Sequence, residues 1–129
     1  MGLAEKKQIR FIEENNIPDI KKRLSNTLGK EIEISINWDS FETVNQLQQI
    51  YHQSLGRITE GIEKIASDDM GKEALQESMT TIHVNNIDDA SAKKVALADG
   101  VLTVDAKWED FSNGIFTPGD YRTKIENLL

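Results

Sequence analysis

The stretch "KKVALADGVLTVDAKW" (residues 93–108) decides the fold class. Two short apolar runs flank Ala98-Asp99-Gly100, and an Asp-Gly pair between such runs is typical of a tight β-hairpin turn. In the second run Leu102, Val104 and Ala106 lie on one face of a strand, and Val101, Thr103 and Asp105 lie on the other. The chain therefore contains at least one hairpin, and its sheet has a buried face.

Two other segments have the same two-residue period. In "KEIEISINW" (residues 30–38) three isoleucines alternate with polar residues. "MTTIHVNNI" (residues 79–87) predicts a strand over 80–87, in which the side chains of Ile82 and Val84 point towards the protein core. The three late strands are joined by short turns, which favours an antiparallel meander. The early strand is expected to join the same sheet.

Apolar residues spaced three and four apart predict helices over 3–15, 18–28, 40–66 and 68–78, and from Thr117 to the C-terminus. "NNIPD" (residues 15–19) is expected to separate the first two helices, because Pro18 suits the first turn of a new helix. Gly29 is expected to end the second helix. Asp39 and Glu42 have capping-box spacing before the third helix, and Thr117 with Pro118 begins the last one.

These elements predict one α+β domain over residues 1–129, with the order α-α-β-α-α-β-β-β-α. The expected sheet is antiparallel and has about four strands, one early strand plus a C-terminal three-strand meander. Helices should pack mainly on one face. Hydrophobic residues make up 38% of the chain, which is sufficient for a core at this length.

Composition excludes several functional classes. The chain has no cysteine, so disulfides, thiolate metal sites and cysteine nucleophiles are excluded. No apolar run approaches the roughly 20 residues of a membrane span, and the N-terminus lacks the apolar core of a signal peptide. A cytoplasmic protein without membrane association is the default expectation. No nucleotide-binding, zinc-protease or serine-hydrolase motif is present, so no cofactor or catalytic residue is assigned.

Charge is unevenly distributed along the chain. The formal net charge is −7, with +3 over residues 1–30 and −10 over residues 31–129. An acidic body repels phosphate backbones, which disfavours general nucleic-acid binding. The same charge favours encounter with a basic protein. The simpler interpretation is that the acidic surface maintains solubility.

The stretch "HVNNIDDAS" (residues 83–91) gathers one of the two histidines with two asparagines and two aspartates. It lacks the glycine and the alternating oxygen ligands of a calcium loop, and two histidines in the whole chain are few for zinc. Asp and Asn favour turns because their side chains hydrogen-bond the local backbone. A polar turn is therefore preferred over a metal site, and no metal ligand is assigned.

Aromatic residues are densest in "WEDFSNGIF" (residues 108–116). In one interpretation these side chains pin the C-terminal loop onto the core. In the other they form an exposed binding surface, since aromatic residues are enriched in interface hot spots.

The leading hypothesis is a non-enzymatic protein-binding module, such as an inhibitor or immunity-type partner of a basic protein. Its contact residues would come from the acidic, aromatic C-terminal region: Asp105, Trp108, Glu109, Asp110, Phe111 and Phe116. The alternative is a small-molecule-binding protein or enzyme with a pocket between sheet and helices, lined by His83, Asp105 and Trp108. Self-association through the strand at 31–37 is a third hypothesis, although its glutamates discourage edge pairing. The oligomeric state is not determined by the sequence.

Overall fold

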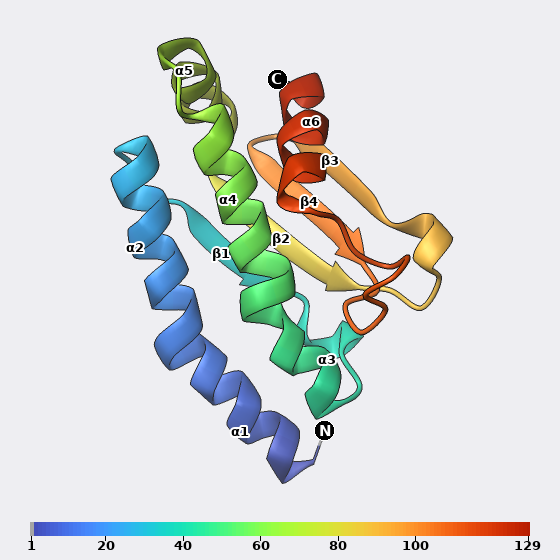
Figure 1. Ribbon diagram of the computed structural model, residues 1–129. Coiled ribbons are helices and arrows are strands. Elements are labelled where there is room, and N and C mark those ends of the chain that lie inside the picture. Colours follow the sequence, from blue (N-terminus) through green and yellow to red (C-terminus); the bar gives the residue numbers. More distant parts are fainter. Residues whose placement is uncertain (1) are drawn as a thin grey trace.

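The computed structural model of the protein describes residues 2–129. Two long helices form most of one layer (Figure 1). The first comprises α1 (Leu3–Phe11), a π-helical turn (Ile12–Asn16) and α2 (Ile17–Leu28) without a break. The second comprises α3 (Val44–Gln49), another π-helical turn (Ile50–Leu55) and α4 (Gly56–Ile65). The two run side by side in the same direction, with their π-helical turns in contact.

The predicted break at residues 15–19 is wrong, because the first helix continues through Pro18. Proline lacks a backbone N–H, and its ring clashes with the carbonyl four residues earlier in an α-helix. The wider π-helical turn ends at Asn16, just before this point, and loosens the backbone where the ring must fit. The prediction that Gly29 ends the helix is confirmed, with a left-handed φ of 69°.

The second long helix begins later than predicted. Trp38–Ser40 forms a 3-10 turn, and the capping box is made by Thr43 and Gln46 instead of Asp39 and Glu42. The Thr43 hydroxyl accepts from the Gln46 backbone N–H at 3.2 Å. The Gln46 side-chain oxygen accepts from the Glu42 and Thr43 N–H groups at 2.7 and 3.3 Å. Both candidate pairs have the required spacing, and the 3-10 turn decides between them.

The two shorter helices agree with their predictions. Helix α5 (Asp69–Ser78) is capped by Asp68, whose side chain accepts from the Gly71 N–H at 2.7 Å. Helix α6 (Pro118–Leu128) begins with Pro118 in its first turn and has a capping box made by Thr117 and Asp120.

The sheet contains β1 (Glu33–Ile36), β2 (Thr81–Asn86), β3 (Lys94–Ala98) and β4 (Val101–Ala106) in the order β1-β2-β4-β3. Strands β1 and β2 are parallel, β2 and β4 are parallel, and only β3 and β4 are antiparallel. The expected antiparallel meander is therefore wrong. The sheet is mixed, although its four strands agree with the prediction, and the order of elements agrees approximately, since the first two predicted helices are continuous.

The difference arises from where the hairpin is inserted. The turn at Asp99-Gly100 is confirmed, and both residues have positive φ, as a two-residue hairpin turn requires. The connection formed by residues 87–93 is long enough to pass from β2 across the position of β4 to the outer strand β3. The hairpin then brings the chain back, so that β4 pairs with β2. Strand β4 alternates between buried and partly exposed residues, as β2 does, which suits a central position. Strand β3 has exposed ends and forms the edge.

Helices cover one face of the sheet, as predicted (Figure 1). On that face the side chains of Ile82, Val84, Leu102 and Val104 are completely buried. On the other face the side chains remain partly or fully exposed, and they are mostly polar or small: Glu33, Ser35, Thr81, His83, Asn85, Lys94, Ala96, Ala98, Val101, Thr103 and Asp105. This second surface is referred to below as the open face. None of the helices within residues 2–129 has the length and apolar character needed to cross a membrane.

Candidate functional site: the acidic end of the sheet

Strands β1, β2 and β4 are parallel, so their carboxyl ends lie at the same end of the sheet (Figure 1). The segments that follow β1, β2 and β4 therefore meet there: residues 37–43, 87–93 and 107–117. In sheets with parallel strands, ligands and partners commonly bind beyond these carboxyl ends, because loops from separate strands converge at that position. This end of the molecule is the natural place to look for a site.

Asn86 holds two of these segments together. Its side chain is 7% exposed. Its backbone N–H donates to the Ser40 hydroxyl at 2.9 Å, and its side-chain N–H donates to the Ser40 carbonyl at 3.2 Å. Its side-chain oxygen accepts from the Trp108 N–H at 3.3 Å. The end of β2 is thus bonded both to the 3-10 turn after β1 and to the loop after β4.

Two of the three aromatic residues of the C-terminal stretch are buried. Trp108 is 0% exposed, and its indole N–H donates to the Asn85 carbonyl at 3.1 Å. Phe116 is 3% exposed and packs edge-on against Tyr121, with ring centres 5.4 Å apart. These two side chains pin the loop onto the core and present no surface to a partner. For Trp108 and Phe116, the structure matches the anchoring interpretation.

Phe111 lies between these anchors and is 58% exposed. The loop that carries it is tightly folded. The Gly114 N–H donates to the Asp110 carbonyl at 2.9 Å, and a Cβ at Gly114 would lie 2.5 Å from the Lys107 carbonyl. The Asp110 carboxylate accepts from the Asn113 N–H at 3.1 Å. A large apolar side chain therefore projects into solvent from a loop that is fixed at both ends.

Carboxylates are concentrated around this loop. Acidic residues occur in the segments that follow the three parallel strands and near the end of β4 itself: Asp39, Glu42, Asp88, Asp89, Asp105, Glu109 and Asp110. Together with Phe111 they are referred to below as the acidic end. The ion pairs formed within residues 2–129 involve other carboxylates, from Glu14, Glu31, Glu33, Glu63 and Glu126. The carboxylates of the acidic end thus form no ion pair among the described residues, and they outnumber Lys93 and Lys107, the basic residues on the same segments.

Hydrogen bonds orient several of these carboxylates. Glu109 accepts from the Gln46 side chain at 3.1 Å, which connects the C-terminal loop to the start of α3. Asp105 accepts from the Asn85 side chain at 2.7 Å, and Asn85 in turn accepts from Asn37 at 2.9 Å. A chain of polar side chains thus crosses β1, β2 and β4 on the open face.

The stretch "HVNNIDDAS" is accounted for as the end of a strand and a polar turn. Asp89 accepts from the Ser91 hydroxyl at 2.7 Å and from the Ser91 N–H at 3.0 Å. Both bonds lower the pKa of the Asp89 carboxyl, and the bond from the Ser91 hydroxyl has the larger effect. His83 points to the open face, where its Nδ1 lies 2.8 Å from the Ser35 hydroxyl. Within residues 2–129 no three side chains of the metal-binding types gather closely enough to hold an ion.

The residues suggested for a pocket are not brought together around one cavity. His83 pairs in register with Thr103, and Asp105 pairs with Asn85, so both lie on the open face. Trp108 instead is buried in the core.

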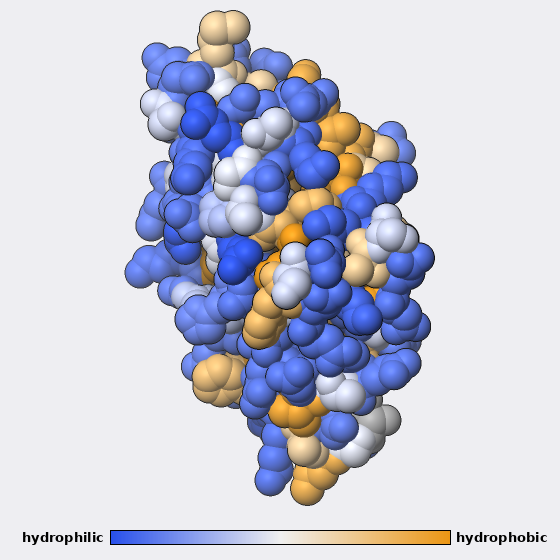
Figure 2. All heavy atoms as spheres, turned by 45° about the vertical axis from the view of Figure 1, so that its right-hand side comes forward, coloured by the Kyte–Doolittle hydropathy of each residue, from blue (hydrophilic) through white to orange (hydrophobic). Residues whose placement is uncertain are grey.

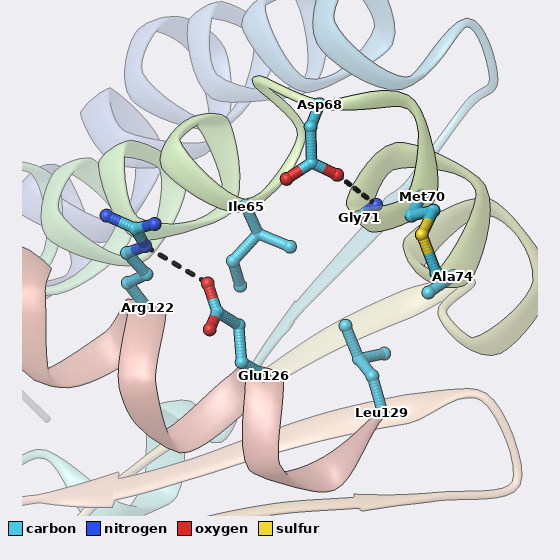
Figure 3. A pocket seen from close by; sticks show the side chains of 8 residues that line it. All are labelled: Ile65, Asp68, Met70, Gly71, Ala74, Arg122, Glu126 and Leu129. Carbon is cyan, nitrogen blue, oxygen red and sulfur yellow. Dashed lines mark hydrogen bonds and ion pairs between the residues drawn. The ribbon is translucent and has the colours of Figure 1, made fainter.

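A hollow of about 340 Å³ lies elsewhere, where the end of α4 meets α5 and α6 (Figure 3). Its apolar lining comes from Ile65, Ala74 and Leu129, and Met70 stands at its mouth, 84% exposed. Arg122 and Glu126 pair with each other at 3.0 Å across one side. The charges at its rim are thus already partnered or, as with Asp68, occupied in capping α5.

Comparison of the chain with family models, curated proteins and solved structures yields no match.

Sequence reasoning identified Asp105, Glu109, Asp110 and Phe111, which lie at this end. It missed the role of Asn86, although two adjacent asparagines at the end of a strand are a signal for backbone bonding.

Proposed function

We propose that the protein is a non-enzymatic binding module whose acidic end docks a basic protein partner. The observation that carries the proposal is the exposure of Phe111 between two buried aromatic anchors. The core does not require this side chain, and its loop holds it out in solvent. Exposed aromatic anchors surrounded by polar residues are typical of interface hot spots.

Electrostatics supports a basic partner over an apolar or acidic one. Within residues 2–129 these carboxylates form no ion pairs, so a lysine- or arginine-rich surface would not have to displace an internal basic side chain. Such charges mainly accelerate encounter and select the partner, whereas the aromatic anchor supplies affinity. An inhibitor of a basic enzyme would fit this description.

The test begins with affinity capture from the native cells at low and high salt, followed by binding measurements with the purified partner. Phe111→Ala should weaken binding by roughly thirtyfold, since truncating a hot-spot side chain costs about 2 kcal/mol. Phe11→Ala is the matched control, because Phe11 is also exposed, at 52%, but lies on α1. The double charge reversal Glu109→Lys/Asp110→Lys should slow association and reduce its salt dependence.

Equal binding by the wild type, Phe111→Ala and the double reversal would show that the acidic end is not the docking surface. If no partner is captured and intact-mass analysis reveals a retained small molecule, the module hypothesis is wrong. The alternative, a small-molecule-binding protein, would then be adopted.

A further inference from the structure

Strand β3 leaves one side of its backbone without partners. It is the outermost strand of the sheet, and in Figure 1 the only coiled ribbon further out is the short 3-10 turn before it (Ala90–Ala92). Across its two-residue turn Ala98 pairs with Val101, so Lys94, Ala96 and Ala98 exchange hydrogen bonds with β4. Val95 and Leu97 therefore direct their N–H and C=O groups outward. In the described part of the chain no turn, loop or cap hydrogen bond reaches these groups.

The opposite edge of the sheet is protected, and the β3 edge is not. Glu33 begins strand β1 and Glu31 precedes it, and both form ion pairs with Lys21, at 3.5 and 3.3 Å respectively. Charged side chains and short length are the usual means by which edge strands avoid pairing. Strand β3 has the sequence KVALA, with a single charge at one end and neither proline nor bulge. The self-association considered for residues 31–37 is thus better suited to β3.

Figure 2 turns this side of the molecule towards the viewer. Apolar atoms form a broken stripe there between hydrophilic side chains. Val95 and Leu97 are partly buried against the core, so their outer surfaces would continue that core across a new strand pair. Ala96 and Ala98 lie on the open face and are small enough for a second sheet to approach without steric conflict.

We infer that β3 pairs antiparallel with β3 of a second copy of this chain about a two-fold axis at Ala96, joining two four-stranded sheets into one. In this register the outward groups of Val95 face those of Leu97 in the second copy, so each unpaired donor meets an acceptor. A two-fold arrangement is self-complementary and closes after two copies.

Charge also favours this register. Each Lys94 would stand opposite Ala98 of the second copy and next to its Asp99, at the turn. Opposite charges at neighbouring cross-strand positions stabilise a pair, and no like charges would face each other. Ala96 lies outside the acidic end, so substitutions at this position test the dimer independently of the proposed function.

Sedimentation velocity of the full chain, from low to high micromolar concentration, tests the inference. The wild type should convert from monomer to dimer. Ala96→Lys and Ala96→Glu should each weaken dimerisation by roughly fivefold or more, because position 96 would face itself in a close, non-hydrogen-bonded pair. An equimolar mixture of the two variants should form the heterodimer. This rescue distinguishes a lost interface from a misfolded chain.

Thr103→Lys is the matched control. Thr103 faces Ala96 on the open face of the same hairpin but belongs to the interior strand β4, so its replacement should leave dimerisation unchanged. A wild type that stays monomeric at every concentration would overturn the inference. So would a dimer that persists in both Ala96 variants, or one that Thr103→Lys disrupts equally.

Discussion

At the scale of single residues, Asn86 has the largest structural role at the acidic end. Replacing it with leucine should lower the free energy of unfolding by about 2 kcal/mol, because the Ser40 carbonyl and the Trp108 N–H would lose their buried partner. Urea unfolding measures the loss. Asn37→Leu is the control, since Asn37 is exposed and its side chain donates one bond, to Asn85. A loss of similar size in both variants would contradict the role assigned to Asn86.

Tyr121 gives the opposite prediction. Its side chain is completely buried, and its hydroxyl has no hydrogen-bond partner among the described residues. Tyr121→Phe should therefore raise the free energy of unfolding by about 1 kcal/mol at neutral pH, because a buried unpaired hydroxyl is costly.

The same residue predicts a pH dependence. Burial raises the pKa of Tyr121 well above its ordinary value of 10.0. The neutral phenol thus contributes stability that is fully present below pH 10 and is lost as the pH rises towards the folded-state pKa. Unfolding measured between neutral and alkaline pH should show a steeper alkaline loss in the wild type than in Tyr121→Phe. Parallel curves would mean that Tyr121 ionises equally in the folded and unfolded states.

The residue scale is also where sequence reasoning reached its limit. Strand alternation placed His83 and Asp105 on the polar face, since side-chain direction in a strand follows from position alone. No such rule applies in the loop after β4, so sequence could not separate Phe111 from Trp108 and Phe116. Trp108 is held by bonds to Asn85 and Asn86, more than twenty positions earlier in the chain, and Phe116 packs against Tyr121 of α6.

At the scale of elements, the π-helical turn before α4 depends on a glycine. A Cβ at Gly56 would lie 2.7 Å from the Tyr51 carbonyl, the acceptor of the Gly56 N–H. Gly56→Ala should therefore destabilise the protein by about 2 kcal/mol, although alanine ordinarily favours helices. Gly119→Ala in α6 is the matched control, because its nearest neighbour is 3.8 Å away, and it should be neutral or stabilising. Thermal unfolding of both variants decides whether the π-helical turn is a fixed feature.

Helix ends and strands were largely predictable because their signals are local. The Asp99-Gly100 turn, Gly29, Asp68 and the Thr117 cap each act within a few residues. The π-helical turns and the order of strands were not predictable for the converse reason. Pro18 interrupts a helix by local rules, yet the π-helical turn before it lets the helix continue, and this turn contacts that of the second long helix. The central position of β4 depends on tertiary packing, because the helices bury one face of β4 more completely than they bury β3.

At the scale of the whole molecule, helices cover one face of the sheet only, and this leaves three surfaces exposed. Helices occupy the core face, which leaves the open face, the β3 edge and the acidic end in contact with solvent (Figure 1). The acidic end is positioned by the parallel strands, and its loop is secured by α6 through the contact of Phe116 with Tyr121. Docking of α6 on α4 should therefore influence binding at a distance from the contact residues.

Gly61 tests this dependence. A Cβ there would lie 2.7 Å from the Tyr121 Cβ and 3.1 Å from the Pro118 carbonyl, so α4 and α6 can approach this closely only with glycine. Gly61→Ala should cost about 2 kcal/mol of stability, as overpacking of a close contact does. Hydrogen exchange should show α6 losing protection before β2 and β4, and partner binding should weaken although Phe111 is intact. If α6 and the sheet instead lose protection together, α6 is not a separately detachable support for the loop.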